Sequence, residues 1–285
     1  MTMRPHPAQR FQAPSTILTG VPLKEVLGRD LVRLVGESFV GVVPEFDRKG
    51  FEADALHGLN ELEFNQRGAH IGKALAAQLP TDFDEAASLL IASLGPELQA
   101  TEGNGLAVFF YLPHAHVIAE RGLACFESGM LANYELTKRM TAEFCIRPFL
   151  VRHRDGCLKM LAKWTKDPNP HVRRLVSEGT RSRLPWAMRL KEFQQNPDFT
   201  LPLLERLKDD SELYVRRSVA NHLADILKDH PDIAFAVCER WIEESDSGKL
   251  TTQQATNRRW IIRHAVRLPA KKGELRAIEI RNAAR

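Results

Sequence analysis

A short motif with two arginines between aliphatic residues occurs twice in the second half of this 285-residue chain, 43 residues apart. Its copies are Val172-Arg173-Arg174-Leu175-Val176 and Val215-Arg216-Arg217-Ser218-Val219. The segment Arg258-Arg259-Trp260-Ile261-Ile262-Arg263 lies one further interval along the chain. An internal repeat of this length predicts stacked pairs of helices, each of which buries its apolar face only against its neighbours. The sequence therefore predicts an all-α fold that winds as a superhelical solenoid.

A period in the low forties with two helices per unit is typical of HEAT-like repeats. Stacking such units places residues of equal phase side by side, so Arg173, Arg216 and Arg259 should form a ladder along one face. Because guanidinium groups bind phosphate oxygens well, a ladder of arginines is suited to a polyanion backbone.

Charge is distributed unevenly along the chain. Residues 151–285 carry 27 Lys and Arg against 18 Asp and Glu, whereas residues 1–150 carry 13 against 18. The basic half, which holds the repeats, favours an anionic partner. Nucleic acid is favoured over a membrane because the apolar and aromatic residues form no lipid-facing stripe. A solvated basic surface without any partner is the alternative.

Neither a membrane span nor a cofactor is expected. The longest apolar stretch, residues 106–119, is interrupted by proline and histidine and falls short of the ~20 residues that a spanning helix needs. His114 and His116 lie two apart without an HExxH motif, and no Walker loop or GxGxxG occurs, so we expect no metal and no nucleotide cofactor. The start of the sequence has no apolar signal segment, and the cysteines show no CxxC pairing, which favours the cytoplasm. The four cysteines are Cys125, Cys145, Cys157 and Cys238.

Proline and glycine divide the chain into short helical segments. Residues 1–18 lack periodicity and are expected to form a mobile arm, followed by a single domain over residues 19–285. The cap of the helix that carries Arg173 is explicit, since Asn169 can accept bonds from first-turn amides and Pro170 suits the first helical position. Gly179 is expected to end that helix in a left-handed conformation. The earlier helices are predicted over residues 23–43, 46–64, 71–79, 83–94, 107–121, 131–149 and 156–164.

Glu143 and Arg147 lie four residues apart and would share a helix face. An ordinary ion pair is the simplest interpretation, worth a few tenths of a kcal/mol. The neighbourhood is unusual, however, because Phe144 and Arg152 are close in sequence and Trp164 ends the next predicted helix. One carboxylate among arginines and aromatic residues is what binding of a cationic base on DNA would need.

Residues 177–187 form a predicted loop with two arginines and a tryptophan. Arg181 and Arg183 suggest a phosphate-binding edge, whereas Trp186 could instead seal the end of the core. The matching positions of the later repeats hold Asn221, His222, Trp260, Arg263 and His264.

Several long segments are similar to the AlkC branch of the AlkC/AlkD-like DNA glycosylases. The resemblance covers nearly the whole chain after residue 18. It implies a superhelix of HEAT-like repeats with a basic concave face for duplex DNA. It also implies hydrolysis of the N-glycosidic bond of cationic alkylated bases, 3-methyladenine and 3-methylcytosine, without flipping of the lesion into a pocket. The segments that carry it are Glu143–Leu150, Asp167–Arg181, Leu184–Ala187 and Tyr214–Leu223, with Pro22–Lys24 and Phe46–Asp47 in the first half.

The chemistry of a cationic leaving group then suggests roles for the candidate residues. Its departure needs little acid catalysis and leaves an oxocarbenium-like sugar, which a carboxylate can stabilise. Glu143 is the predicted catalytic residue of a monomeric, cofactor-free enzyme that acts on duplex DNA. The residues predicted to contact DNA or the lesion are Phe144, Arg147, Arg152, Trp164, Arg173, Arg174, Arg181, Trp186, Arg216, Arg217, Arg259, Trp260 and Arg263.

Two other classes of function stay open on the sequence. One is a non-catalytic HEAT-repeat scaffold that uses the arginines to bind an acidic protein. The other is a DNA-binding repeat protein without catalysis, in which Glu143 is only the ion-pair partner of Arg147.

Overall fold

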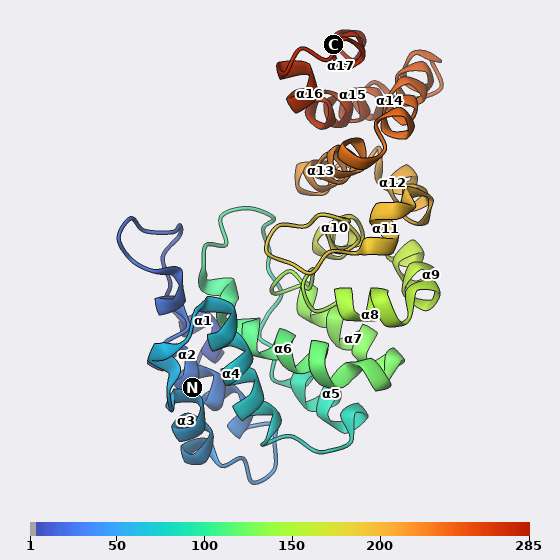
Figure 1. Ribbon diagram of the computed structural model, residues 1–285. Coiled ribbons are helices and arrows are strands. Elements are labelled where there is room, and N and C mark those ends of the chain that lie inside the picture. The colour runs from blue at the N-terminus through green and yellow to red at the C-terminus, as the bar shows by residue number, and fades with distance from the viewer. Residues whose placement is uncertain (1–3) are drawn as a thin grey trace. The chain divides into compact units, whose positions relative to one another are not determined.

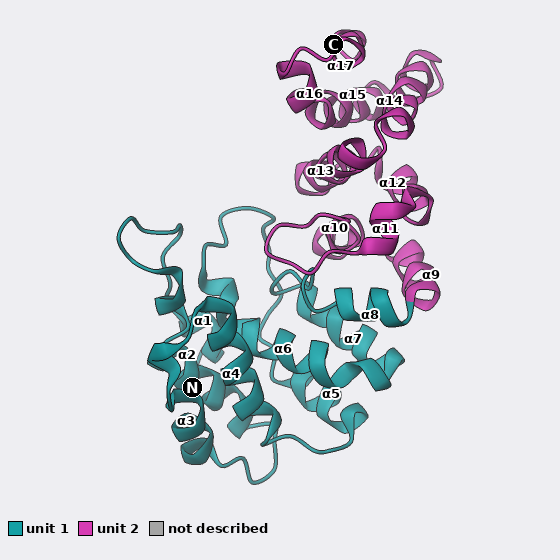
Figure 2. Cartoon of the chain, viewed as in Figure 1, with its two compact units in different colours: residues 1–153 teal, residues 154–285 magenta. Residues whose placement is uncertain are grey.

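A computed structural model describes residues 4–285, and over these residues the chain is built from helices and their connections without a strand (Figure 1). The all-α prediction is confirmed. The chain forms two compact units, residues 1–153 and 154–285 (Figure 2). Within the described residues, no helix is long and apolar enough to cross a membrane. The single domain predicted from residue 19 stays a prediction.

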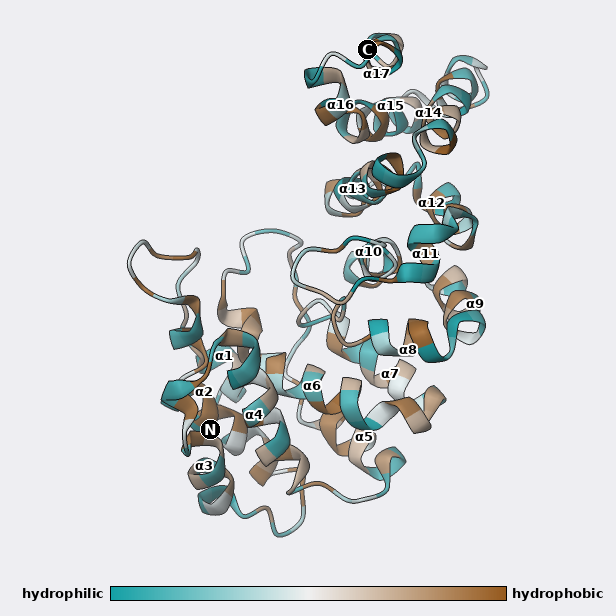
Figure 3. Cartoon of the chain, viewed as in Figure 1, coloured by the Kyte–Doolittle hydropathy of each residue, from teal (hydrophilic) through white to brown (hydrophobic). Residues whose placement is uncertain are grey.

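Unit 1 is a bundle of short helices in which α1 to α4 pack in chain order, α5 packs on α7, and α4 packs most extensively on α6. Figure 3 shows the amphipathic character of these helices, with hydrophobic and hydrophilic residues on the same element. Its α-helices are α1 (Pro7–Arg10), α2 (Arg29–Val40), α3 (Arg48–Leu56), α4 (Phe64–Ala76), α5 (Phe83–Ala92), α6 (Leu112–Arg121), α7 (Phe126–Thr137) and α8 (Arg147–Arg152). Its 3-10 turns are η1 (Leu23–Val26), η2 (Leu59–Glu61), η3 (Ala107–Tyr111) and η4 (Gly122–Ala124).

The start of the chain is packed where the sequence suggested mobility. Phe11 is buried and its ring lies 5.9 Å from that of Phe110, while Arg10 donates to Glu37 on α2 at 2.5 Å. A buried aromatic ring and an ion pair thus hold α1 and Phe11 against the core, and the mobile arm over residues 1–18 stays a prediction. Residues 1–3 of that arm lie outside the described residues.

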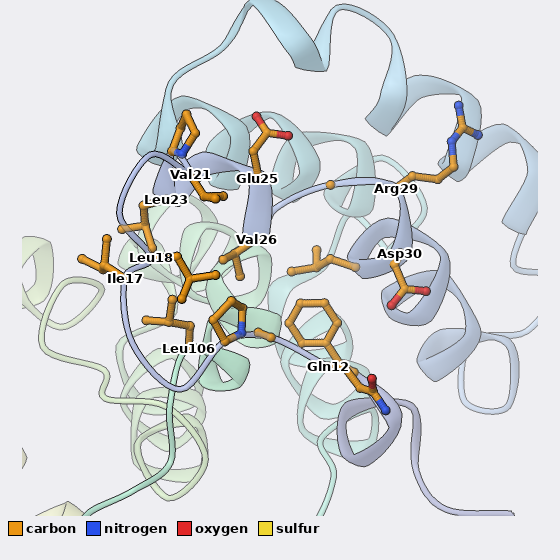
Figure 4. Close-up of a pocket in the computed structure, with 16 residues that line it drawn as sticks. Gln12, Ile17, Leu18, Val21, Leu23, Glu25, Val26, Arg29, Asp30 and Leu106 are labelled. Carbon is orange, nitrogen blue, oxygen red and sulfur yellow. The ribbon is translucent and has the colours of Figure 1, made fainter.

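The segment after Phe11 surrounds a cavity of about 360 Å³. Figure 4 shows Leu18, Val26 and Leu106 gathered around it, from segments far apart in the sequence. Ile17 and Val21, also in its lining, remain exposed. Glu25, Arg29 and Asp30 also line the cavity, and we assign it no chemistry.

The predicted helix over residues 131–149 is two helices. α7 ends at Thr137, and α8 begins only at Arg147. Phe149 of α8 is fully buried against glycines, since a Cβ on Gly129 would lie 2.3 Å from its ring and one on Gly122 would lie 2.9 Å from it. The ring fits only because both positions lack a side chain. This packing fixes α8 on α7 and so positions the connecting segment that contains Glu143.

The predicted start of the helix at residue 71 was too late, because the capping residues before Phe64 were not considered. The helix expected from residue 71 begins at Phe64, where Glu63 and Gln66 form a reciprocal capping box. Gly68 and Gly72 follow within the helix, which weakened the helical pattern there, but they let α6 approach closely.

Unit 2 stacks helices in the manner of a solenoid. α10 packs on α13 and α13 on α15, while α12 and α14 lie against α13 on the outer layer. Helices α10 and α13 begin 43 residues apart, as the repeat predicted. The helices of unit 2 are α9 (Arg154–Trp164), α10 (Pro170–Gly179), α11 (Lys191–Gln195), α12 (Leu201–Leu207), α13 (Leu213–Asp229), α14 (Pro231–Asp246), α15 (Thr252–Ala265), α16 (Arg267–Lys271) and α17 (Leu275–Ala283), with a 3-10 turn η5 (Pro197–Phe199).

The start of α10 agrees with its sequence signals, and its end does not. Asn169 Oδ1 accepts from the His171 amide at 2.9 Å, and Pro170 occupies the first helical position. Gly179 is the last helical residue, and the cap is Thr180 with φ of −93°. The expected left-handed glycine is therefore wrong, because α10 ends in a right-handed turn that needs no glycine.

Candidate nucleic-acid interface

The first arginine of each repeat motif forms hydrogen bonds within unit 2. Nη1 of Arg173 donates to the backbone carbonyls of Asp167 and Pro168 at 2.9 and 3.1 Å. Arg216 makes the same contacts one period later, at 2.8 and 2.6 Å from the carbonyls of Asp210 and Ser211. Each arginine therefore ties the first turn of its helix to the loop that precedes it.

Arg173 also joins one repeat to the next. Its Nε and Nη2 donate to the two carboxylate oxygens of Asp210 at 2.6 and 3.0 Å, and only 13% of its side chain is exposed. Arg259 in turn pairs with Asp246. The guanidinium groups of these three arginines are thus bonded within the fold. As DNA contacts, Arg173, Arg216 and Arg259 stay predictions.

The second residue of each motif is placed differently. Arg174, Arg217 and Trp260 occupy equivalent positions 43 residues apart on α10, α13 and α15. The guanidinium of Arg174 lies over the Tyr214 ring, 5.1 Å from its centroid, and Arg217 is exposed. In this second register Arg217 is therefore the exposed cation, whereas the Arg174 side chain is 15% exposed and lies 3.4 Å from Glu178.

Five side chains of α13, α15 and α16 form what we call the α13–α15 patch, defined by Arg217, Asn221, Trp260, His264 and Arg267. Trp260 and His264 stack with centroids 4.8 Å apart and planes 12° apart. Arg267 donates to Asn221 Oδ1 at 3.2 Å. Burial, together with the charges of Arg267 and Arg217, lowers the pKa of His264 to about 4. The patch thus combines two cations with a neutral, stacked aromatic pair, a combination that suits nucleic acid.

Arg263 lies on the same helix as Trp260 and points elsewhere. Its Nη1 donates to the backbone carbonyl of Ala284, just after α17. Burial lowers its pKa, and the nearby charges of Arg259 and Arg281 lower it further. Arg263 therefore holds the end of the chain against α15, and its predicted contact with DNA stays a prediction. Arg267 was missed by sequence reasoning, although its position three residues after His264 was a usable signal.

The loop after α10 is fixed to α13 by two ion pairs. Arg181 is buried and contacts Asp225 at 2.8 Å and Glu178 at 2.6 Å. Arg183 binds both carboxylate oxygens of Asp229 at 2.7 and 2.5 Å. Asp225 and Asp229 are one turn apart on α13, so they grip two alternate residues of the loop. Both arginines face carboxylates, and the expected phosphate-binding edge stays a prediction.

Glu178 completes this buried network. Burial raises the pKa of Glu178, but the charges of Arg174 and Arg181 outweigh that effect and hold the pKa below its usual range. Its second oxygen accepts from Ser218 Oγ at 2.6 Å. The carboxylate is therefore ionised and bonded on both oxygens.

Trp186 lies at the tip of the fixed loop and projects away from the core. Its side chain is 78% exposed, although Leu184 and Leu190 on either side of it are buried. Its φ is +61°, in the left-handed region that a bulky residue rarely adopts. The alternative in which Trp186 seals the core is excluded. Strain of this kind is typically kept at functional sites.

Glu143 lies in unit 1, in the turns that precede α8. It is 9% exposed, and Thr141 Oγ1 donates to its Oε2 at 2.7 Å. The backbone from Ala142 to Arg147 forms consecutive hydrogen-bonded turns, so the shared face of a long helix is wrong. The carboxylate is thus nearly buried and oriented by a neighbouring hydroxyl.

The other predicted residues around Glu143 differ in exposure. Phe144 is half-buried, and Arg152, the last residue of α8, is exposed. Arg147 is completely buried at the first position of α8, which leaves its guanidinium no surface for a phosphate. Its predicted contact with DNA stays a prediction. Trp164, half-buried, ends α9 in unit 2 as expected.

These observations define a helical-repeat protein with a basic and aromatic face, and comparisons with known proteins identify its family. No family model matches the chain. It is 32% identical over 259 residues to the uncharacterized protein YhaZ of Bacillus subtilis (strain 168), covering 90% of this chain and 67% of that protein. It is also similar to Pseudomonas fluorescens alkylpurine DNA glycosylase AlkC, solved bound to DNA containing an abasic site analog. That match has a TM-score of 0.79 and 38% identity, and it covers 93% of this chain and 69% of the other. The chain belongs to the AlkC branch of the AlkC/AlkD-like DNA glycosylases.

We predict that Asp210→Ala lowers the free energy of unfolding by about 2 to 3 kcal/mol, because Arg173 loses its bidentate partner while it is largely buried. Urea unfolding followed by circular dichroism measures the change. Asp232→Ala on α14 is the matched control, since the Asp232 carboxylate is exposed and its pair with Arg276 should contribute little. Equal stability of the two variants would show that Arg173 does not depend on Asp210.

Trp186→Gly should be more stable than Trp186→Ala by about 1 kcal/mol, because glycine adopts a positive φ without strain and alanine does not. Both variants remove the same exposed indole, so the comparison isolates the backbone. Thermal unfolding of the two proteins measures the difference. The reverse order of stability would mean that the loop relaxes to a negative φ when the indole is absent.

Proposed function

We propose that this protein is a DNA glycosylase of base excision repair that hydrolyses the N-glycosidic bond of cationic alkylated bases in duplex DNA. The observation that carries the proposal is its 38% identity, across 93% of its length, to a glycosylase solved on DNA. 3-Methyladenine and 3-methylcytosine are the proposed substrates. We further propose that it acts in the cytoplasm as a monomer, without a cofactor and without flipping the lesion.

The α13–α15 patch supports contact with a nucleic-acid backbone. Arg217 is exposed on α13, the helix that also anchors the loop carrying Trp186. Arg217 and Arg267 both lie close enough to His264 for their charges to lower its pKa. Cations of this kind bind phosphates and fix the register of a protein on a duplex without reading its sequence. Such contacts suit an enzyme that must find lesions in any sequence.

The environment of Glu143 supports a role in the chemical step. The alkylated base leaves as a neutral species once the glycosidic bond breaks, so no proton has to be supplied to it. Positive charge develops on the deoxyribose instead, and a carboxylate held by Thr141 in a nearly buried position can stabilise that charge or orient the attacking water. The side chain is oriented before the reaction, which limits the cost of reorganisation.

We expect Arg217→Gln to weaken duplex binding and to reduce the slope of log affinity against log salt by about one unit, because one phosphate contact is lost. Fluorescence anisotropy over a series of salt concentrations measures the slope. Lys249→Gln removes the same charge from the exposed loop after α14 and should leave the slope unchanged.

A salt-independent affinity of the wild-type protein would contradict the polyanion proposal. The scaffold that binds an acidic protein would then become the better explanation. An Arg217→Gln protein with the wild-type slope would instead place the DNA contact elsewhere on unit 2.

Glu143→Gln should retain the fold and most of the duplex affinity, while it slows base release by on the order of 10²-fold. Single-turnover excision of 3-methyladenine and the melting temperature are measured on the same variant. Glu127→Gln, an exposed carboxylate on α7 of the same unit, is the control and should excise at the wild-type rate.

A wild-type excision rate in a well-folded Glu143→Gln protein would remove Glu143 from the mechanism. Glu120 would then be the next carboxylate to test, because Glu178 is already bonded to Arg181 and Ser218. A lower melting temperature with an intact rate would assign Glu143 a purely structural role.

A further inference from the structure

We infer that Trp186 is a wedge that enters the duplex beside the lesion and unstacks the adjacent base step, with Arg189 on the neighbouring phosphate. The inference rests on the proposed function, since it takes duplex DNA as the partner. It goes further in assigning one side chain the distortion of the DNA.

Exposure is the first argument. Trp186 has the highest exposed fraction, 78%, among the large hydrophobic side chains at the surface of the described residues. It therefore contributes little to the core, and solvent exposure of an indole is unfavourable. Pro185 and Met188 are exposed beside it, so the tip of the loop is apolar.

The fixed ends of the loop are the second argument. Arg181 and Arg183 are bound to Asp225 and Asp229, and the amide of Leu190 donates to the Ser182 carbonyl at 3.3 Å. An apolar tip on a mobile loop would fold back onto the protein, whereas this one is held outward. Trp186 itself has a positive φ between these fixed ends. The indole is thus positioned before any partner arrives, which reduces the entropy lost on binding.

The charge of the loop favours DNA over an apolar protein surface. Arg181 and Arg183 are neutralised by their carboxylates, whereas Arg189 is exposed and makes no ion pair with any described residue. An apolar side chain next to a cation that lacks a carboxylate partner is the combination that inserts between base pairs while it contacts the flanking phosphate. Aromatic stacking on bases is tolerant of sequence, as a lesion-searching protein requires.

Unstacking by Trp186 would also explain how a buried lesion becomes accessible without being flipped. A wedge at the neighbouring step opens the stack and bends the duplex, and the sugar of the lesion then becomes accessible to a carboxylate and water. Trp186 is a positioning residue in this account, because it acts on the shape of the DNA and touches no reacting atom.

The test uses the full chain and a duplex with 2-aminopurine next to a tetrahydrofuran abasic-site analogue. Binding of the wild-type protein should raise 2-aminopurine fluorescence several-fold at saturation, because the reporter loses its stacking partner. Trp186→Ala should lose most of that rise, and Trp186→Phe should restore part of it. Leu275→Ala, which removes a side chain that is 75% exposed on α17, should behave as the wild type.

The position of the wedge is tested separately through its anchor. Arg183→Gln leaves the indole intact but frees one end of the loop from Asp229. It should lower the fluorescence rise at saturation by at least twofold, with a smaller change in affinity. A rise equal to that of the wild type would overturn the role assigned to the loop anchors.

Single-turnover release of 3-methyladenine is measured in parallel, so that two failures can be told apart. Base release by the wild type together with an unchanged fluorescence rise in a folded Trp186→Ala protein would overturn the wedge alone. A fluorescence rise that depends on Trp186, in a wild-type protein that releases no base, would support the wedge and refute the glycosylase. Absence of wild-type binding to the duplex would overturn both.

Discussion

Asp210 holds three successive repeats of unit 2 together. Its carboxylate binds the guanidinium of Arg173 from α10, and its backbone carbonyl accepts from Arg216 on α13 and from Asn257 on α15. One residue in the loop before α13 thus fixes the register of the three inner helices. In a solenoid each repeat contacts only its neighbours, so the arrangement of the helices depends on such contacts between repeats. The surface presented to a partner therefore depends on them as well.

The two arginines of each repeat motif have different surroundings. Arg173 and Arg216 bind the preceding loops, whereas the next residue in each motif, Arg174 or Arg217, lies over a ring or at the surface. Adjacent residues of a helix point about 100° apart, so the two arginines of one motif face different neighbours. Arg173 and Arg217 should therefore differ in what their removal costs, stability in one case and affinity in the other.

The loop between α10 and α11 applies the same principle to an apolar group. Two carboxylates one turn apart on α13 hold Arg181 and Arg183, and the rigid segment between the loop ends carries Trp186 outward. The stability contributed by the ion pairs offsets the strain of a left-handed tryptophan. In our proposal the loop distorts DNA and the α13–α15 patch holds its backbone, while Glu143 in unit 1 supplies the charge that the glycosidic bond requires.

The amino-acid sequence by itself determined the all-α class, the 43-residue register, the cap of α10 at Asn169 and the family, because each depends on residues close together in the chain or on motif identity. It could not decide which arginines are held by carboxylates, since those that bind Arg173 and Arg181 lie 37 and 44 residues away. Nor could it place Glu143 in a turn or expose Trp186, because burial of one side chain depends on packing by many others. Helix propensity and the repeat period depend on residues close together in the sequence. Ion pairs and the burial of side chains form only when segments distant in the sequence come into contact.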